Sequence, residues 1–190
     1  MNTPTHIIVN YALLSDQSIS KKEKWSVILG GIIPDIFIYF LFFWALVVGI
    51  PQRTLWSETY FEPGWQLAID LLNSLPIFIA LGLVGWVIKK RWLLLFSVSM
   101  CLHFVADFFT HADDAHRHFL PLSNYRFESP ISYWDRDFNG EVGGAIENAL
   151  LIVAVTYLWT RLKTRWIKIV LLVYIVLSLA MGILAPIIFS

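Results

Sequence analysis

The 190-residue sequence contains a single cysteine and few charged residues. Cys101 can form no disulfide within the chain, and it carries no information about the cellular compartment. Charged residues make up 15% of the chain, against about 25% in a typical soluble domain. The 14 basic residues are balanced by 14 acidic ones. There is no basic patch of the size that nucleic-acid binding needs, so we expect no nucleic-acid partner.

Two common enzyme motifs are also missing. The sequence has no glycine-rich phosphate loop and no Gly-x-Ser-x-Gly turn. These absences argue against a nucleotide-driven motor and against a serine hydrolase. The sequence shows no internal repeat, and we treat residues 1–190 as a single domain.

What the chain has in excess is apolar sequence. Hydrophobic residues account for 57% of it, and its mean hydropathy is +0.65. A helix needs about 20 mostly apolar residues to cross a bilayer, and several runs are about that long. The runs cover residues 25–50, 67–88, 92–110, 142–160 and 166–189. Tryptophans lie near many of their ends, as in an interfacial aromatic belt. We therefore predict an all-α, polytopic transmembrane bundle.

A shorter helix is expected before the first run, so the predicted bundle has five to six membrane helices. Pro4 suits the first helical position, with Thr3 as the N-cap. Extended to about Ser18, this segment is long enough for a tilted crossing of the membrane.

Basic residues indicate the orientation of the bundle. They cluster in three alternate connections, at residues 21–24, 89–91 and 161–168. The positive-inside rule makes these connections cytoplasmic. Six crossings then place both termini and the long loop 112–141 outside. In a bacterium this is the periplasmic side of the inner membrane.

Four of the five histidines fall in one sixteen-residue window. His103, Asp107 and His111 are spaced i, i+4, i+8, so on a helix they form one stripe. An unpaired ionisable group inside a membrane costs about 2.5–3.5 kcal/mol even on a lenient scale. One divalent metal ion would satisfy all three groups, and imidazole with carboxylate suits zinc and its neighbours.

Other candidate residues lie toward the same outer end of the bundle. Asp35 follows Pro34, whose kink opens the backbone; it is a candidate metal ligand or base, or it bonds a freed amide. His6 is either a ligand or an interfacial polar residue. Glu147 follows a glycine pair and is a candidate ligand, general base or partner of a histidine.

The loop after the stripe is dense in possible ligands. His116 and His118 would face the same way on an extended backbone, and both metal ligation and a solvated loop remain open for them. For Asp113 and Asp114 we favour a solvated loop. Arg117 suits a phosphate by the geometry of its guanidinium, although an ordinary surface arginine is the alternative.

Three more polar residues have weaker interpretations. Arg126 has the same two alternatives as Arg117. Asp70 and Asn73, in the second apolar run, are expected to hydrogen-bond across helices. Since they are nearly the only polar residues expected in the cytoplasmic half of the membrane, a transport path from side to side is disfavoured.

The Thr-His near the N-terminus, the Pro-Asp in the next helix and the His-Phe-x-x-Asp-x-x-x-His motif resemble the bacterial membrane-bound metal-dependent hydrolases. The best-known member of this family is LexA-regulated, and the family is similar to the zinc-dependent phospholipases C. The resemblance covers roughly residues 1–150 and implies a metal site. Its implied ligands are His6, Asp35, His103, Asp107 and His111, with Glu147 completing the site. A proline of the phospholipase signature is absent and the spacing is shorter, so we expect one or two ions.

We therefore expect a membrane-embedded hydrolase that cleaves a lipid or a lipid-linked phosphoester on the extracytoplasmic side, using zinc. Glu147 or Asp35 would accept the proton, and Arg117 would steady charge on phosphate oxygens. Three alternatives stay open. They are a zinc-dependent lipid amidase of the ceramidase kind, a metal transporter or sensor, and a structural protein whose His/Asp stripe joins helices.

Overall fold

A computed structural model describes residues 1–16 and 18–188 of the chain, with side chains placed up to residue 180. These residues form helices and irregular loops with no strand among them, as predicted. The helices are α1 (Thr3–Leu14), α2 (Lys21–Ile32), α3 (Ile36–Val48), α4 (Gln52–Ser57), α5 (Pro63–Leu72), α6 (Leu75–Val87), α7 (Arg91–Phe108), α8 (Gly140–Arg161) and α9 (Arg165–Ile188). Three 3-10 turns lie between them, η1 (Ile33–Asp35), η2 (Thr59–Phe61) and η3 (Arg136–Phe138).

Within the described residues, four helical stretches are long and apolar enough to cross a membrane. They are Lys21–Val48, Pro63–Val87, Arg91–Phe108 and Gly140–Arg161. Each coincides within a few residues with a predicted apolar run. Large apolar side chains are exposed on their outer faces, for example Val47 at 87% and Trp86 at 70%. Soluble monomers rarely expose contiguous apolar surface of this kind, whereas a lipid-facing surface requires it.

The first helix differs from its prediction at both ends. Its N-cap is Asn2 and not Thr3, and it ends at Leu14, short of residue 18. At 1.5 Å per residue its 12 residues span about 18 Å. It packs against α2, α7 and α8.

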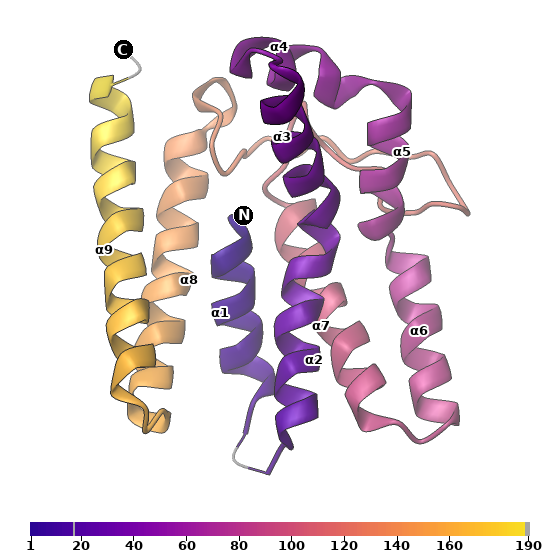
Figure 1. Cartoon of the computed structure of the whole chain (residues 1–190), viewed down its shortest axis with the longest axis vertical. Helices are drawn as coiled ribbons and strands as arrows, with labels where there is room; N and C mark the ends of the chain where they lie inside the picture. The colour runs from indigo at the N-terminus through magenta and orange to yellow at the C-terminus, as the bar shows by residue number, and fades with distance from the viewer. Residues whose placement is uncertain (17, 189–190) are drawn as a thin grey trace.

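The helices run up and down, so that the connections separate into two ends (Figure 1). The α1–α2, α6–α7 and α8–α9 connections lie together at the lower end of the view. The three basic clusters lie in these connections or in the helix turns that adjoin them. α4 and the loop between α7 and α8 lie toward the opposite end. At the basic end, Ser20 and Glu23 form a capping box that starts α2.

Two of the long stretches are broken inside the bundle. Pro34 has no amide hydrogen to donate, and α2 tightens into η1 there before α3 begins. The second break follows Asn73, where the Ser74 hydroxyl caps α6 by accepting from the Ile77 amide at 3.3 Å. The Asn73 side chain donates to the Pro34 carbonyl at 3.1 Å and joins the two breaks. Irregular backbone at membrane depth is tolerated where it is buried in protein, as both breaks are here.

The loop between α7 and α8 folds back onto the end of α7. The Ser129 amide donates to the His111 carbonyl and the Tyr133 amide to the Thr110 carbonyl, both at 2.9 Å. Phe127 stacks on Phe108 with ring centroids 4.6 Å apart. The loop is thus packed structure and covers the C-terminal end of α7.

Candidate metal centre

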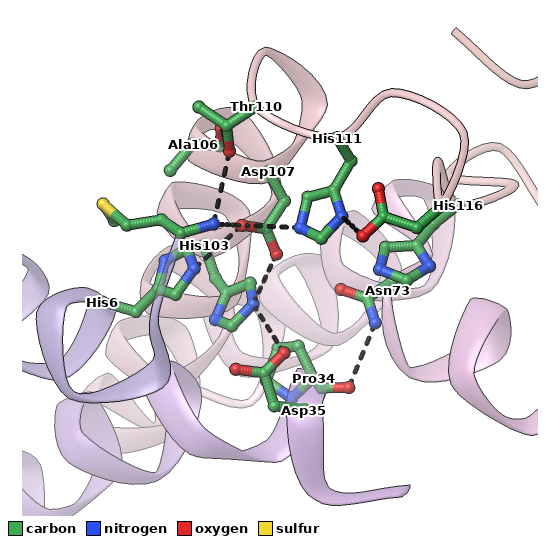
Figure 2. A network of polar contacts seen from close by, with 12 residues as sticks. His6, Pro34, Asp35, Asn73, His103, Ala106, Asp107, Thr110, His111 and His116 are labelled. Carbon is green, nitrogen blue, oxygen red and sulfur yellow. Dashed lines mark hydrogen bonds and ion pairs between the residues drawn. The ribbon is translucent and has the colours of Figure 1, made fainter. Parts of the chain in front are cut away.

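All five histidines are buried, with at most 6% of any one exposed. They gather with carboxylates at the level of the two helix breaks, and Figure 2 shows most of them. We divide them into two groups. The inner group is His6, Asp35, His103 and Asp107; the loop group is His111, His116 and His118, with Asp70 and Asp114 beside them.

The inner group comes from three separate helical segments. Ligand atoms of His6, Asp35 and His103 all lie within 4.8 Å of one another. His103 Nε2 is 2.8 Å from Asp107 Oδ2 and 3.3 Å from Asp35 Oδ1. His6 Nε2 and the Met1 amino group each lie 2.9 Å from Asp107 Oδ1. The two imidazole rings stack with centroids 3.5 Å apart.

These residues fit a divalent cation. His103 Nε2 makes no hydrogen bond although two carboxylate oxygens lie close to it. The Nδ1 atom of His103 lies 3.2 Å from the Gly31 carbonyl. A carbonyl only accepts, so Nδ1 carries a hydrogen, and Nε2 is the ring atom left to bind a metal ion, as in metal-bound histidines. The two carboxylates of the group offer negative charge to a bound dication.

Local structure explains why these side chains converge. His103 and Asp107 are one turn apart on α7. The break at Pro34 places Asp35 beside the other residues of the inner group, and the Thr3 hydroxyl donates to Asp35 Oδ2 there. Sequence reasoning missed this contact by Thr3, because it connects two segments that are far apart along the chain.

The predicted helical stripe is correct for its first two members only. α7 ends at Phe108, so His111 lies in the turn that follows and not on the helix. Its amide donates to the Asp107 carbonyl at 3.1 Å, and its Nε2 lies 3.6 Å from Asp107 Oδ1. The turn therefore keeps His111 close to the inner group, but the residue belongs to the α7–α8 loop.

The loop group places His116 and His118 inside the protein. Their exposed fractions are 1% and 2%, so a solvated loop does not describe them. The same interpretation holds for the exposed Asp113 but is wrong for Asp114. Asp114 is largely buried, and its Oδ2 lies 2.9 Å from His111 Nδ1.

Charges in the loop group perturb three ionisable groups. Burial lowers the pKa of His111, but the carboxylates of Asp107 and Asp114 outweigh it and raise the pKa to about 9. Burial raises the pKa of Asp114, and the contact with His111 lowers it to about 2. Burial and the neighbouring His116 lower the pKa of His118 to about 4. His118 is therefore neutral at pH 7, the form in which an imidazole binds metal.

Asp70 has a larger role than the predicted cross-helix hydrogen bond. It is fully buried, and it binds the side chain of Arg117 and accepts from the Arg117 amide at 3.0 Å. The Arg126 guanidinium lies 3.7 Å from the same carboxylate and donates to Gln66 at 3.0 Å. One acid thus faces two arginines, whose side chains are 24% and 31% exposed. The two guanidinium groups carry more positive charge than Asp70 neutralises, and both are partly accessible to solvent.

Glu147 is not a member of the inner group. Its Oε1 accepts from the Asn2 amide at 3.1 Å, the Asn2 side chain at 2.9 Å and the Thr5 hydroxyl at 2.7 Å. A carboxylate at this position stabilises the N-terminus of α1, where the helix dipole is positive. Glu147 therefore holds the helix that carries His6 and acts as a positioning residue.

No protein-family model matches the chain, and neither the curated proteins nor the solved structures contain a match. The function is therefore argued from the geometry of the site. The resemblance to membrane-bound metal-dependent hydrolases remains an expectation from the motifs.

Proposed function

We propose that the protein is a membrane-embedded metal-dependent hydrolase whose centre is the inner group. The observation that carries the proposal is the convergence of His6, Asp35 and His103 within 4.8 Å, buried and from separate helices. Ionisable residues at membrane depth are rare because burying them is costly, and they usually mark functional sites. The motifs shared with the membrane-bound metal-dependent hydrolases support the same conclusion.

Zinc is the ion that we propose, in one or two copies, because imidazole and carboxylate are its common protein ligands. A bound dication would supply Lewis-acid polarisation of the scissile bond and of water. Asp35 is our candidate for the proton acceptor, since its side chain is 12% exposed against 2% for Asp107. In this role Asp35 does not bind the ion, which His6, His103 and Asp107 would hold; the Thr3 hydroxyl occupies Oδ2 of Asp35, and Oδ1 is left to take the proton from attacking water.

We propose a lipid or lipid-linked phosphoester as substrate. Arg117 and Arg126 present more positive charge than Asp70 neutralises, and guanidinium groups suit phosphate oxygens. The apolar outer faces of the helices would place this site within reach of lipid headgroups. Arg117 is held by Asp70, so its guanidinium is oriented before a substrate arrives.

The proposed topology has six crossings, in which α1 and α9 join the four apolar stretches described above. The basic connections gather at one end (Figure 1), and the positive-inside rule makes that end cytoplasmic. The termini and the α7–α8 loop would then be extracytoplasmic, facing the periplasm if the membrane is a bacterial inner membrane.

Two single-cysteine variants, each made in a Cys101→Ser background, would test this topology. Ser123→Cys lies in the α7–α8 loop and Thr164→Cys in the α8–α9 connection, and both positions are exposed. We expect a membrane-impermeant thiol reagent to label Ser123→Cys in intact cells and Thr164→Cys only after the membrane is opened. The reverse pattern, or labelling of both positions in intact cells, would contradict the orientation.

Transport of a metal ion is less well supported than hydrolysis. Three buried polar side chains between the centre and the basic end are engaged in helix packing. Asn10 donates to the Ser99 carbonyl at 2.8 Å, Ser97 to the Phe78 carbonyl and Ser99 to the Val27 carbonyl at 2.7 Å. These groups join helices and offer no ionisable ligand for a passing cation.

A product analysis would test hydrolysis. Metal-loaded protein is incubated with a mixed phospholipid pool, and the products are read by mass spectrometry. We expect diacylglycerol or phosphatidic acid together with the freed headgroup, and we expect Asp107→Asn to abolish them while the fold persists. Asp113→Asn, at an exposed acid near the site, should retain activity. Free fatty acid would favour the amidase or an acyl hydrolase instead, and no lipid consumption by metal-loaded protein would refute a lipid hydrolase.

A further inference from the structure

A cavity of about 300 Å³ lies between α1, α2, α8 and α9, toward the basic end of the bundle. Among the described residues, α1 packs against both α2 and α8, whereas α2 packs closely against neither α8 nor α9. Figure 1 shows α1 standing between α2 and α8. The cavity has the size of a small ligand site, which starts at about 300 Å³. Neither the inner group nor the proposed hydrolysis uses this space.

The walls of the cavity are largely apolar. Ile8, Leu158 and Leu171 line it, and they belong to the hydrophobic core that joins α1, α8 and α9. Trp25 and Ile28 line it from α2, and 55% of Trp25 is exposed. A tryptophan near the end of a membrane helix usually lies at the level of the lipid headgroups. The walls therefore suit a hydrocarbon chain that extends from the headgroup level into the membrane.

Two lysines of α2 line the same cavity. Lys21 is exposed and Lys24 is half-buried. Among the described residues that line the cavity there is no acid. Asp16 and Glu23, the acids of this segment, accept hydrogen bonds from nearby serines. The cavity therefore combines apolar walls with uncompensated positive charge.

The α8–α9 connection adds positive charge at the same end of the bundle (Figure 1). Residues 161–168 include four bases and no acid. Basic pockets between membrane helices on the cytoplasmic side typically bind anionic lipid headgroups. An anionic phospholipid would use both the charge and the apolar walls, whereas a free phosphate would leave the walls without a partner.

We infer that this cavity binds an acyl chain of an anionic phospholipid, whose phosphate pairs with Lys21 and Lys24. The inference does not rest on the proposed hydrolase, because the site contains no residue of the inner group and the lipid is bound and not cleaved. Ile7 and Ile8 line the cavity and directly follow His6 on α1. A bound chain would therefore contact the helix that carries His6.

Native mass spectrometry of the full-length protein in a neutral detergent would measure this binding. The probes are dioleoyl phosphatidylglycerol and dioleoyl phosphatidylcholine, which have the same chains and differ in net charge. We expect phosphatidylglycerol to bind about tenfold more tightly than phosphatidylcholine, because basic residues near a membrane surface attract anionic lipids. We expect added inorganic phosphate not to displace the bound lipid.

Charge-removing variants would locate the site. Lys21→Gln combined with Lys24→Gln leaves the capping box of α2 in place, and we expect it to bind phosphatidylglycerol about tenfold more weakly. Lys89→Gln combined with Lys90→Gln removes the same charge from exposed positions at the α6–α7 connection and should retain the lipid. Arg117→Gln should retain it too, which separates this lipid from a substrate at the proposed hydrolase centre.

Four results would overturn the inference. Equal affinity of the wild type for the two lipids, or displacement of the lipid by phosphate, would do so without any variant. Equal loss of lipid from the Lys21/Lys24 and Lys89/Lys90 variants would show attraction by overall charge alone. Loss of the lipid from Arg117→Gln would assign it to the other end of the bundle. None of these results bears on zinc binding by the inner group, which tests the hydrolase proposal separately.

Discussion

His103→Ala is expected to release the metal ion of the inner group and to abolish hydrolysis. His103 is the only inner-group residue whose one nitrogen approaches two carboxylates, at 2.8 and 3.3 Å. Losing an outer partner of a metal ligand typically costs about 10–100-fold in affinity, so losing the ligand itself should cost more. The measurement is zinc affinity by competition with a chelator, together with product formation from phospholipid.

The matched control for this variant is Cys101→Ala. Cys101 lies two residues earlier on α7 and is only partly buried. We expect its substitution to leave both zinc affinity and activity near the wild-type level. Equal zinc affinity in His103→Ala and Cys101→Ala would show that the inner group is not a metal centre.

Gly30→Ala is expected to destabilise the bundle at the contact between α2 and α7, the helix that carries His103. A Cβ at Gly30 would lie 2.6 Å from both the Phe96 carbonyl oxygen and the Ser99 Cβ. Both belong to α7, so α2 and α7 would have to move apart. Overpacking of this kind costs about 1–3 kcal/mol. Since α7 carries His103, we also expect weaker zinc binding.

Gly64→Ala provides the matched control. Apart from its chain neighbours and the backbone of its own helix, no atom lies within 4 Å of a Cβ added at Gly64 in α5. Alanine there should be neutral, or stabilise by about 0.4–1 kcal/mol through the unfolded chain. The midpoint of thermal unfolding in one detergent compares the two variants. Gly30→Ala unfolding at the same temperature as Gly64→Ala would show that the α2–α7 contact is not tight.

The sequence predicted most of the secondary structure, because helix formation in apolar runs depends on local properties. Runs of about 20 apolar residues become helices with little regard to their neighbours. Pro34 breaks its helix for a local reason, the missing amide. His103 and Asp107 face the same way because they are one turn apart.

The sequence was less informative about where a helix ended or broke. His111 fits a helical stripe by spacing, yet α7 ends at Phe108. The break after Asn73 was missed as well, although Ser74 as the N-cap and Pro76 in the first turn of α6 mark it locally. It is stabilised by the α7–α8 loop, since the Leu75 amide donates to the His118 carbonyl at 2.9 Å. Such an end depends on a partner that is remote in sequence.

By itself, the sequence determined that this protein is helical and apolar, and that it gathers histidines and carboxylates of metal-binding type. Tertiary structure decided which of them meet. Glu147 and Asn2 are 145 residues apart, and Asp70 and Arg117 are 47 apart. Their contacts depend on which helices become neighbours and at what depth. Helical periodicity assigns a residue to a face of its own helix, and only packing determines what that face touches.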